Sequence, residues 1–286
     1  MDNRPIGFFD SGLGGLTCIP YLMRALPNER IIYFGDTART PYGSKAEKTI
    51  RAFGGEIAGF LAARDVKMIA IACNTVSSVA LEDIRRTHPE LPVLGIISPA
   101  SHTVANTCTP ENRIGVIGTK ATIRSAAYPD KILEYNPALD VYQQACPALV
   151  PLIEEGIIEN EIMDLTLRYY LDSFIAYNEI DTLVLGCTHY PLVRRNILRL
   201  YPGLRIVDPS MEILESIRDT LGRLDLFAEA GEGSGGRREN NLFYASDLSE
   251  SFVNMIHRIF AGTDLRVTFQ NIDLDELERR EIDHGF

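Results

Sequence analysis

Residues 68–75 read Met68-Ile69-Ala70-Ile71-Ala72-Cys73-Asn74-Thr75, and residues 182–189 read Thr182-Leu183-Val184-Leu185-Gly186-Cys187-Thr188-His189. Each stretch begins as a short apolar run, which is typical of a strand buried on both faces of a parallel sheet. Each run ends on a cysteine, and the hydroxyl or amide residues that follow predict the start of a helix. Because ligands of open α/β sheets bind beyond the carboxyl ends of the strands, we expect both thiols to lie where chemistry takes place.

Strand-like runs alternate with helical patterns on either side of these stretches, which predicts an α/β fold with parallel-rich sheets flanked by helices. In the first series, strands are expected at residues 6–10, 30–34, 67–72 and 92–96, with helices at 15–26, 45–64 and 75–87. In the second series, strands are expected at 113–117, 139–143 and 182–186, with helices at 147–155 and 161–177. A helix at 212–221, a surface loop at 229–236, a strand at 242–245, a helix at 250–260 and an acidic solvated end at 273–281 complete the prediction.

The two series resemble weak repeats of one another. Ile6-Gly7-Phe8-Phe9-Asp10-Ser11 is matched by Ile114-Gly115-Val116-Ile117-Gly118-Thr119, and each cysteine follows its opening strand at a similar distance. Chance similarity between two buried units stays open on spacing alone. We expect two similar, pseudo-twofold domains, the first formed by residues 1–97 and 208–286 and the second by residues 98–207. The active site is then expected in the cleft between them.

The composition argues against several classes of function. The net charge of -11 and the lack of a basic stripe argue against a nucleic-acid partner, because phosphate binding needs clustered Lys and Arg. No apolar run approaches the roughly 18 residues of a membrane span, and the N-terminus lacks the pattern of a secretory signal. Five cysteines, an odd number, fit reduced thiols better than a disulfide framework. We therefore expect a cytoplasmic protein with no membrane partner.

The residues around the two cysteines leave several kinds of chemistry open. A helix start stabilises a thiolate, but a cysteine at a strand end is also a common core residue. The loop from Asp10 to Gly15 can hold an anion or be an ordinary turn, and its spacing fits neither common nucleotide-binding pattern. Cys73, Cys187 and His189 lack the paired spacing of a zinc site or of a redox motif, so we expect no metal.

Taken together, these motifs resemble those of the glutamate racemases, cofactor-independent members of the aspartate/glutamate racemase superfamily. Each matching piece is weak alone, whereas the ordered set spans nearly the whole chain and is specific. The pieces are Phe9-Asp10-Ser11-Gly12-Leu13-Gly14-Gly15, Pro41-Tyr42-Gly43, Ala72-Cys73-Asn74-Thr75, Gly118-Thr119-Lys120-Ala121-Thr122 and Gly186-Cys187-Thr188-His189-Tyr190-Pro191. The resemblance implies a homodimer that interconverts L- and D-glutamate without a cofactor and supplies D-glutamate for peptidoglycan synthesis.

The resemblance also implies roles for individual residues. Cys73 and Cys187 are implied to be the catalytic acid/bases, with Cys73 deprotonating the D isomer and Cys187 the L isomer. Asp10 is implied to assist Cys73, and Glu154 and His189 to assist Cys187. The residues implied to bind substrate are Asp10, Ser11, Tyr42, Gly43, Asn74, Thr75, Thr119, Thr122, Thr188 and His189. Only nine residues precede Asp10, so we expect no activation by a peptidoglycan precursor, which some relatives link to an N-terminal extension.

Two thiols on opposite walls can invert Cα, whereas a single base would have to cross the substrate with its proton. Other functions stay open beside this one. Racemases of aspartate or hydantoin and maleate isomerases are related enzymes. A pyridoxal-phosphate racemase would have Lys120 as its anchor. A non-catalytic amino-acid-binding protein could use the same two-domain cleft without needing paired thiols.

Overall fold

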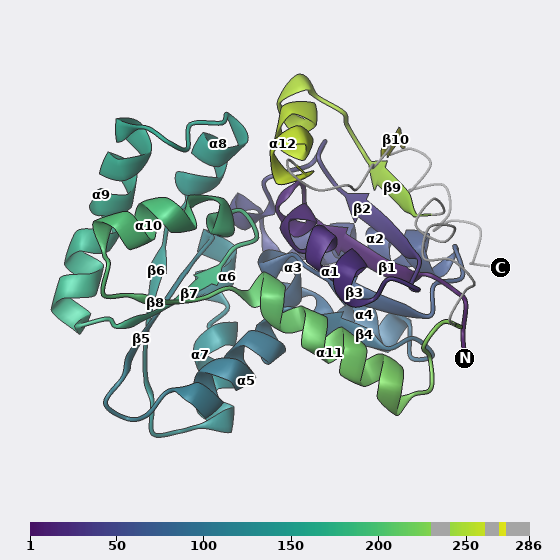
Figure 1. Cartoon of the computed structure of the whole chain (residues 1–286), viewed down its shortest axis with the longest axis horizontal. Helices are drawn as coiled ribbons and strands as arrows, with labels where there is room; N and C mark the ends of the chain where they lie inside the picture. Colours follow the sequence, from purple (N-terminus) through teal and green to yellow (C-terminus); the bar gives the residue numbers. More distant parts are fainter. Residues whose placement is uncertain (230–240, 261–268, 273–286) are drawn as a thin grey trace.

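Two parallel sheets form the two lobes of the molecule (Figure 1). The computed structural model describes residues 1–229, 241–260 and 269–272, so the predicted acidic end and all but the first residue of the predicted loop at 229–236 lie outside the described residues. The strand order is β10-β9-β2-β1-β3-β4 in the first sheet and β6-β5-β7-β8 in the second. Every strand pair is parallel, which confirms the predicted α/β fold class.

The first sheet alternates its side chains between two apolar layers, as the period of two in a strand requires. Phe8 packs in the layer that contains helices α1 and α11, whereas Phe9 packs in the layer that contains α2. The strands are β1 (Ile6–Asp10), β2 (Ile31–Gly35), β3 (Met68–Ile71), β4 (Val93–Gly95), β9 (Leu242–Ala245) and β10 (Phe269–Asn271). The covering helices are α1 (Ile19–Ala25), α2 (Glu47–Ala62), α3 (Asn74–Val79), α4 (Leu81–Thr87), α11 (Pro209–Arg223) and α12 (Glu250–Phe260).

The second sheet repeats the core of the first. Its order β6-β5-β7-β8 corresponds to β2-β1-β3-β4, which is the arrangement that a structural repeat predicts. Its strands are β5 (Arg113–Gly118), β6 (Asp140–Ala145), β7 (Thr182–Gly186) and β8 (Arg205–Val207). Its helices are α6 (Lys120–Arg124), α7 (Ala127–Tyr135), α8 (Leu149–Glu154), α9 (Glu161–Asn178) and α10 (Arg194–Leu200). Cys73 follows β3 and Cys187 follows β7, so the thiols occupy equivalent places in the two lobes.

Two segments connect the lobes. Helix α5 (Ile97–Thr107) leads from β4 to β5 and contacts both α7 and α11. After β8 the chain enters α11, and β9 then pairs with β2 in the first sheet. Sheet membership thus changes near residues 97 and 207, while the exact domain boundaries stay a prediction. Within the described residues, no helix has the length and apolar character needed to cross a bilayer.

Several element boundaries differ from the sequence prediction. The helix predicted at 75–87 is divided into α3 and α4 at Ala80, and the helix predicted at 15–26 begins with a 3₁₀ turn, η1 (Gly14–Cys18). In α3, the hydroxyls of Ser77 and Ser78 bond to the backbone carbonyls of Ile71 and Thr75, which competes with regular helix formation. Strands β8 and β10 and helices α5, α6 and α7 were not predicted from the sequence.

Candidate functional site

The turn after β7 is placed by a pair of glycines. Gly118, the last residue of β5, is the register partner of Gly186, the last residue of β7. A side chain at Gly186 would lie 2.7 Å from the carbonyl oxygen of Ile117, so the two strands approach this closely only with glycine there. Thr119 and Cys187 therefore leave the sheet side by side, at the point where the strand order reverses.

The turn after β3 occupies the corresponding point of the first sheet. Cys73 is the N-cap residue of α3, and its sulfur accepts a hydrogen bond from the backbone N–H of Val76 at 3.5 Å. The Cys73 thiol also lies 3.4 Å from the hydroxyl of Ser11, which follows β1. Ser11 thus stands beside Cys73 as Thr119 stands beside Cys187.

The helix predicted to begin at Cys187 begins later. The backbone N–H of Tyr190 donates a hydrogen bond to the carbonyl oxygen of Cys187, which closes a turn. The 3₁₀ helix η3 (Tyr190–Val193) follows, with His189 as its N-cap. Pro191 lies within the first turn of η3, as predicted from its sequence position. The thiol of Cys187 therefore depends on neighbouring side chains rather than on a helix N-terminus.

Both thiols line one small cavity between the lobes, of about 20 Å³, which is room for about one water molecule. Ten of the thirteen predicted site residues line it: Ser11, Tyr42, Gly43, Cys73, Asn74, Thr75, Thr119, Cys187, Thr188 and His189. Thr40, Pro41 and Val150 also line it and had not been predicted as site residues. The lining includes no Lys or Arg, so His189 is the one residue of this set that can carry a positive charge.

The other three predicted residues lie behind the lining and bond to it. Asp10 is fully buried and accepts hydrogen bonds from the Thr188 hydroxyl at 3.2 Å and from the N–H of Gly12 at 3.0 Å. Thr122 lies 3.0 Å from the Thr119 hydroxyl. Glu154 reaches the cavity through His189, as described next. These residues act on the cavity through the residues that line it.

Two ionisable side chains, His189 and then Glu154, lie in sequence behind the Cys187 thiol. Glu154 Oε1 lies 3.0 Å from Nε2 of His189, and Nδ1 of His189 lies 3.8 Å from the sulfur of Cys187. Burial opposes the charged imidazolium, but the hydrogen bonds to Cys187 and Glu154 outweigh burial and raise the pKa of His189 well above its ordinary value. A protonated His189 places a positive charge beside the sulfur of Cys187.

The Cys73 thiol has the opposite electrostatic setting. Burial, and next the nearby carboxylate of Asp10, raise the pKa of Cys73 to about 12, although Ser11 and the N–H of Val76 act against this rise. Burial also raises the pKa of Asp10, against the influence of His189. Cys73 is therefore held as a thiol. The two sulfurs are equivalent in the fold, but a carboxylate lies near Cys73 and an imidazole near Cys187.

Hydroxyl groups join the lobes across the cavity. Thr75 in the first lobe lies 3.0 Å from the Thr119 hydroxyl and 3.3 Å from the Thr122 hydroxyl in the second. The backbones also meet: a side chain at Gly43 would lie 2.3 Å from Cβ of Thr119, and one at Gly14 would lie 2.2 Å from the Thr188 hydroxyl oxygen. The structure therefore has its lobes closed on the cavity.

The loop that carries Tyr42 and Gly43 is fixed from behind. The Tyr42 side chain is buried, and its hydroxyl donates to the carboxylate of Asp36, which also accepts from Arg39 Nε at 2.6 Å and from the Ser246 hydroxyl at 2.7 Å. The Tyr42 hydroxyl is thus already bonded, and what Tyr42 and Gly43 can offer a ligand is backbone N–H. The sequence pattern could not distinguish these two possibilities.

Two buried polar atoms of the lining, Nδ2 of Asn74 and Oγ1 of Thr40, have no hydrogen-bond partner among the described residues. Buried polar groups are nearly always bonded, so unmatched ones in a cavity indicate where a ligand binds. Thr40 has no sequence signal of its own beyond its place before Pro41. Lys120, the anchor that a pyridoxal-phosphate enzyme would need, is exposed and does not line the cavity. Among the described residues, no group of three or more His, Cys, Asp or Glu side chains is arranged to hold a metal.

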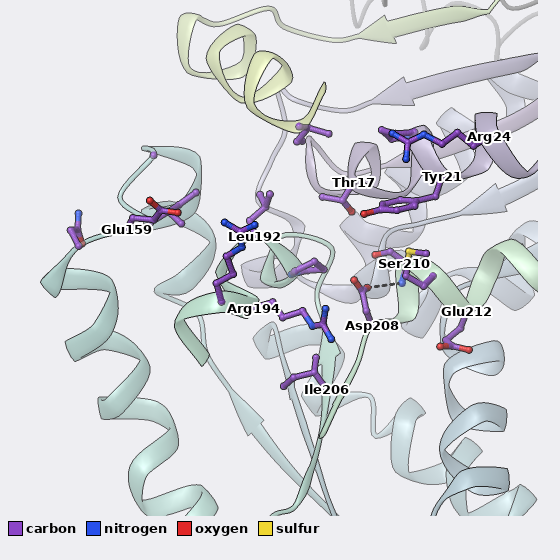
Figure 2. A pocket seen from close by; sticks show the side chains of 18 residues that line it. Thr17, Tyr21, Arg24, Glu159, Leu192, Arg194, Ile206, Asp208, Ser210 and Glu212 are labelled. Carbon is purple, nitrogen blue, oxygen red and sulfur yellow. Dashed lines mark hydrogen bonds between the residues drawn. The ribbon is translucent and has the colours of Figure 1, made fainter. Parts of the chain in front are cut away.

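A larger groove of about 1100 Å³ lies elsewhere between the lobes, and Figure 2 shows side chains from α1, α10 and the start of α11 around it. It contains none of the predicted site residues. Its labelled charged groups, Arg24, Arg194 and Asp208 among them, extend from separate elements, and Asp208 bonds to Ser210. The larger groove therefore does not coincide with the predicted site residues, whereas both thiols line the small cavity.

Comparison with known proteins identifies the family of the chain. A sequence model of the Asp/Glu/Hydantoin racemase family matches residues 18–216. The chain belongs to this family. It is 42% identical over 263 residues to the glutamate racemase of Geobacter metallireducens, an alignment that covers 92% of this chain and 94% of the relative. The predicted family and the predicted enzyme class, an amino-acid racemase, are confirmed.

Solved racemase structures share the fold. The glutamate racemase of Francisella tularensis, determined in complex with D-glutamate, is 37% identical and has a TM-score of 0.86, covering 96% of this chain and 100% of that chain. The Escherichia coli glutamate racemase, in complex with L-glutamate and the activator UDP-MurNAc-ala, is 26% identical with a TM-score of 0.73, covering 94% and 98%. The two-lobed architecture of this racemase family member is therefore shared with enzymes that bind either isomer of glutamate.

Proposed function

We propose that this chain is a glutamate racemase that interconverts L- and D-glutamate with Cys73 and Cys187 as its two acid/base groups. The observation that carries the proposal is that these thiols leave equivalent strands of the two sheets and line one cavity. The family match and the glutamate racemases at 42% to 43% identity support the choice of reaction and substrate.

The protons balance without any cofactor. With L-glutamate, the Cys187 thiolate removes the Cα proton and becomes a thiol, while the Cys73 thiol protonates the opposite face of the carbanion and becomes a thiolate. With D-glutamate, the same steps run backwards from the Cys73 thiolate. One proton is thus shared between two sulfurs, and each direction leaves the enzyme ready for the other isomer.

The surroundings of each sulfur fit this sharing of one proton. The imidazolium of His189, held by Glu154, places a positive charge beside the sulfur that is proposed to remove the proton of L-glutamate. The carboxylate of Asp10 favours the thiol of Cys73. The assistance that Asp10 gives is therefore to keep Cys73 ready as an acid. In the free enzyme Cys73 should therefore keep its proton, as the step with L-glutamate requires.

Neutral donors are proposed to bind both carboxylates of the substrate. The unmatched atoms Nδ2 of Asn74 and Oγ1 of Thr40, together with the hydroxyls of Ser11 and Thr75, face a cavity without Lys or Arg. Acid/base catalysis typically contributes about 10² to 10⁴ in rate, so donors near the α-carboxylate must stabilise the charge that develops there as well. In a closed cavity that excludes water such donors act more strongly.

The lobes must separate for the substrate to enter. Glutamate has ten non-hydrogen atoms, whereas the cavity of about 20 Å³ holds about one water molecule. The cross-lobe contacts of Thr75 with Thr119 and Thr122 would break on opening, and the substrate would then take over hydroxyls that now bond to each other. The closed structure is therefore proposed to be one end of an opening motion.

The wider biological setting is proposed on the same basis. D-glutamate is the product that peptidoglycan synthesis would consume, and the enzyme would act in the cytoplasm as a homodimer, with no nucleic-acid or membrane partner. These statements rest on the resemblance to the glutamate racemases and on the composition of the chain.

The test is incorporation of solvent deuterium at Cα, measured by mass spectrometry or NMR on D- and L-glutamate. Enantiomers have equal free energies, so their kcat/KM values must be equal, and the role of each thiol is visible in exchange without inversion. Cys73→Ser should lose racemisation and exchange with D-glutamate but keep slow exchange with L-glutamate, and Cys187→Ser should do the reverse. Cys108→Ser, which changes a buried thiol outside the cavity, is the matched control.

Three outcomes would contradict the proposal. Racemisation at wild-type rates in both site variants would exclude the two-thiol mechanism. Turnover of aspartate, a hydantoin or maleate in place of glutamate would keep the family and change the substrate. Glutamate binding without any deuterium at Cα would favour the non-catalytic binding protein.

A further inference from the structure

Tyr128, the second residue of α7, lies between the two thiol-bearing turns. It is fully buried, and its hydroxyl donates to Oδ1 of Asn74 at 2.6 Å. Its ring lies against Gly186, since a Cβ at that glycine would meet Cε2 of Tyr128 at 3.2 Å. One side chain of the second lobe thus touches both the residue before Cys187 and the residue after Cys73.

The hydrogen bond from Tyr128 decides which way the Asn74 amide faces. A buried hydroxyl proton without an acceptor is costly, and Oδ1 of Asn74 is the acceptor recorded for it. Burial raises the pKa of Tyr128 well above its ordinary value, so the hydroxyl keeps the proton that it donates. With Oδ1 engaged, the NH₂ group of Asn74 is the part left for the cavity that this residue lines, and Nδ2 has no partner among the described residues.

The backbone before Tyr128 is adapted to this placement. Ala126, between α6 and α7, has φ 54° and ψ 13°, the left-handed conformation that non-glycine residues rarely adopt. Such backbone strain is retained where the surrounding structure requires it. The left-handed conformation of Ala126 changes the direction of the chain before α7. The first turn of α7 then places the Tyr128 ring against Gly186, at the end of β7.

We propose that Tyr128 is a positioning residue for the substrate, which rests on the proposed function. Its hydroxyl fixes the amide of Asn74 with Nδ2 directed into the cavity, where the N–H groups donate to a carboxylate of glutamate. Because Tyr128 belongs to the second lobe and Asn74 to the first, this orientation is imposed as the lobes close. Tyr128 itself does not touch the reacting atoms.

The test is a double-mutant cycle of Tyr128→Phe and Asn74→Ala, with KM and kcat measured for both isomers. Tyr128→Phe keeps the ring on Gly186 and removes the hydroxyl, so KM should rise about tenfold for each isomer while kcat changes much less. In the Asn74→Ala background, removal of the hydroxyl should raise KM no further, because the residue through which it acts is gone. If the hydroxyl were purely structural, its loss would raise KM and lower kcat together in either background.

Tyr201→Phe is the matched control, since it also removes a hydroxyl that donates to a side-chain oxygen, Oδ1 of Asp172, at 2.6 Å but lies outside the cavity. Its KM should equal that of the wild type. The inference is overturned if KM of Tyr128→Phe is unchanged, or if the two KM effects multiply in the double variant. Absence of glutamate racemisation in the wild type would overturn the proposed function first, and this inference with it.

Discussion

Gly43→Ala should hold the lobes apart and lower kcat/KM by about 100-fold while leaving the fold intact. A methyl group at residue 43 would lie 2.3 Å from Cβ of Thr119, whereas ordinary contacts begin at 3.4 Å, so the two loops must separate by about 1 Å. A displacement of about 1 Å between reacting groups costs about 100-fold in rate. Gly43 does not have a left-handed φ, so alanine adds no backbone strain.

The assay follows racemisation in both directions by circular dichroism or chiral chromatography, with thermal unfolding measured in parallel. Because the clash joins loops of different lobes, each lobe can fold around the new methyl group and Tm should change little. Gly55→Ala in α2 is the matched control: nothing lies within 4 Å of its new Cβ, so kcat/KM should be unchanged and stability should rise by about 0.5–1 kcal/mol. A Gly43→Ala enzyme with wild-type kcat/KM would refute the argument that close approach of these loops is required.

Three further results are expected. The thiolate absorbance at 240 nm, taken as the difference between the wild type and Cys73→Ser, should show no ionisation of Cys73 from pH 7 to 9, because its pKa in the closed structure is raised to about 12; a transition in this range would contradict it. Glu154→Gln should lower kcat/KM about tenfold and equally for both isomers in a racemisation assay, since it weakens the charged support of His189. Lys67→Met should lower the free energy of unfolding in urea by about 3–5 kcal/mol, because it leaves Glu29 buried without its ion-pair partner, and Lys67→Met with Glu29→Gln should lose less.

The sequence predicted most of the elements that set the site, for physical reasons. The runs before Cys73 and Cys187 are apolar over a whole strand because both faces of these strands are covered, and this pattern is visible without coordinates. The motifs around them located ten of the thirteen residues that line the cavity. Several elements outside these motifs were missed, the three-residue β8 and the longer helices α5 and α7 among them.

What the sequence could not predict is how side chains meet across the cavity. Tyr128 has no motif of its own, and its contact with Asn74 joins residues 54 positions apart in different lobes. Thr40 is an ordinary loop residue until the fold leaves its hydroxyl unmatched beside the thiols. The bonded state of the Tyr42 hydroxyl likewise depends on Asp36, whose side chain is fixed only in the folded protein. Such pairings are decided by the packing of lobes and not by local pattern.

Cys73 and Cys187 occupy equivalent positions in the two lobes but have different charged neighbours, and this difference affects the kinetic constants for the two isomers. If their positions in the fold alone set the protonation states of the two thiols, each would be ionised equally often. The enzyme would then be in the correct protonation state for either isomer equally often. Burial and the nearby Asp10 carboxylate hold Cys73 as a thiol, which in the proposed mechanism is the form that accepts L-glutamate. Because kcat/KM must stay equal for two enantiomers of equal free energy, the bias can appear only as a compensated difference between KM and kcat. A weaker apparent affinity for D-glutamate would then be matched by a proportionally larger kcat for that isomer.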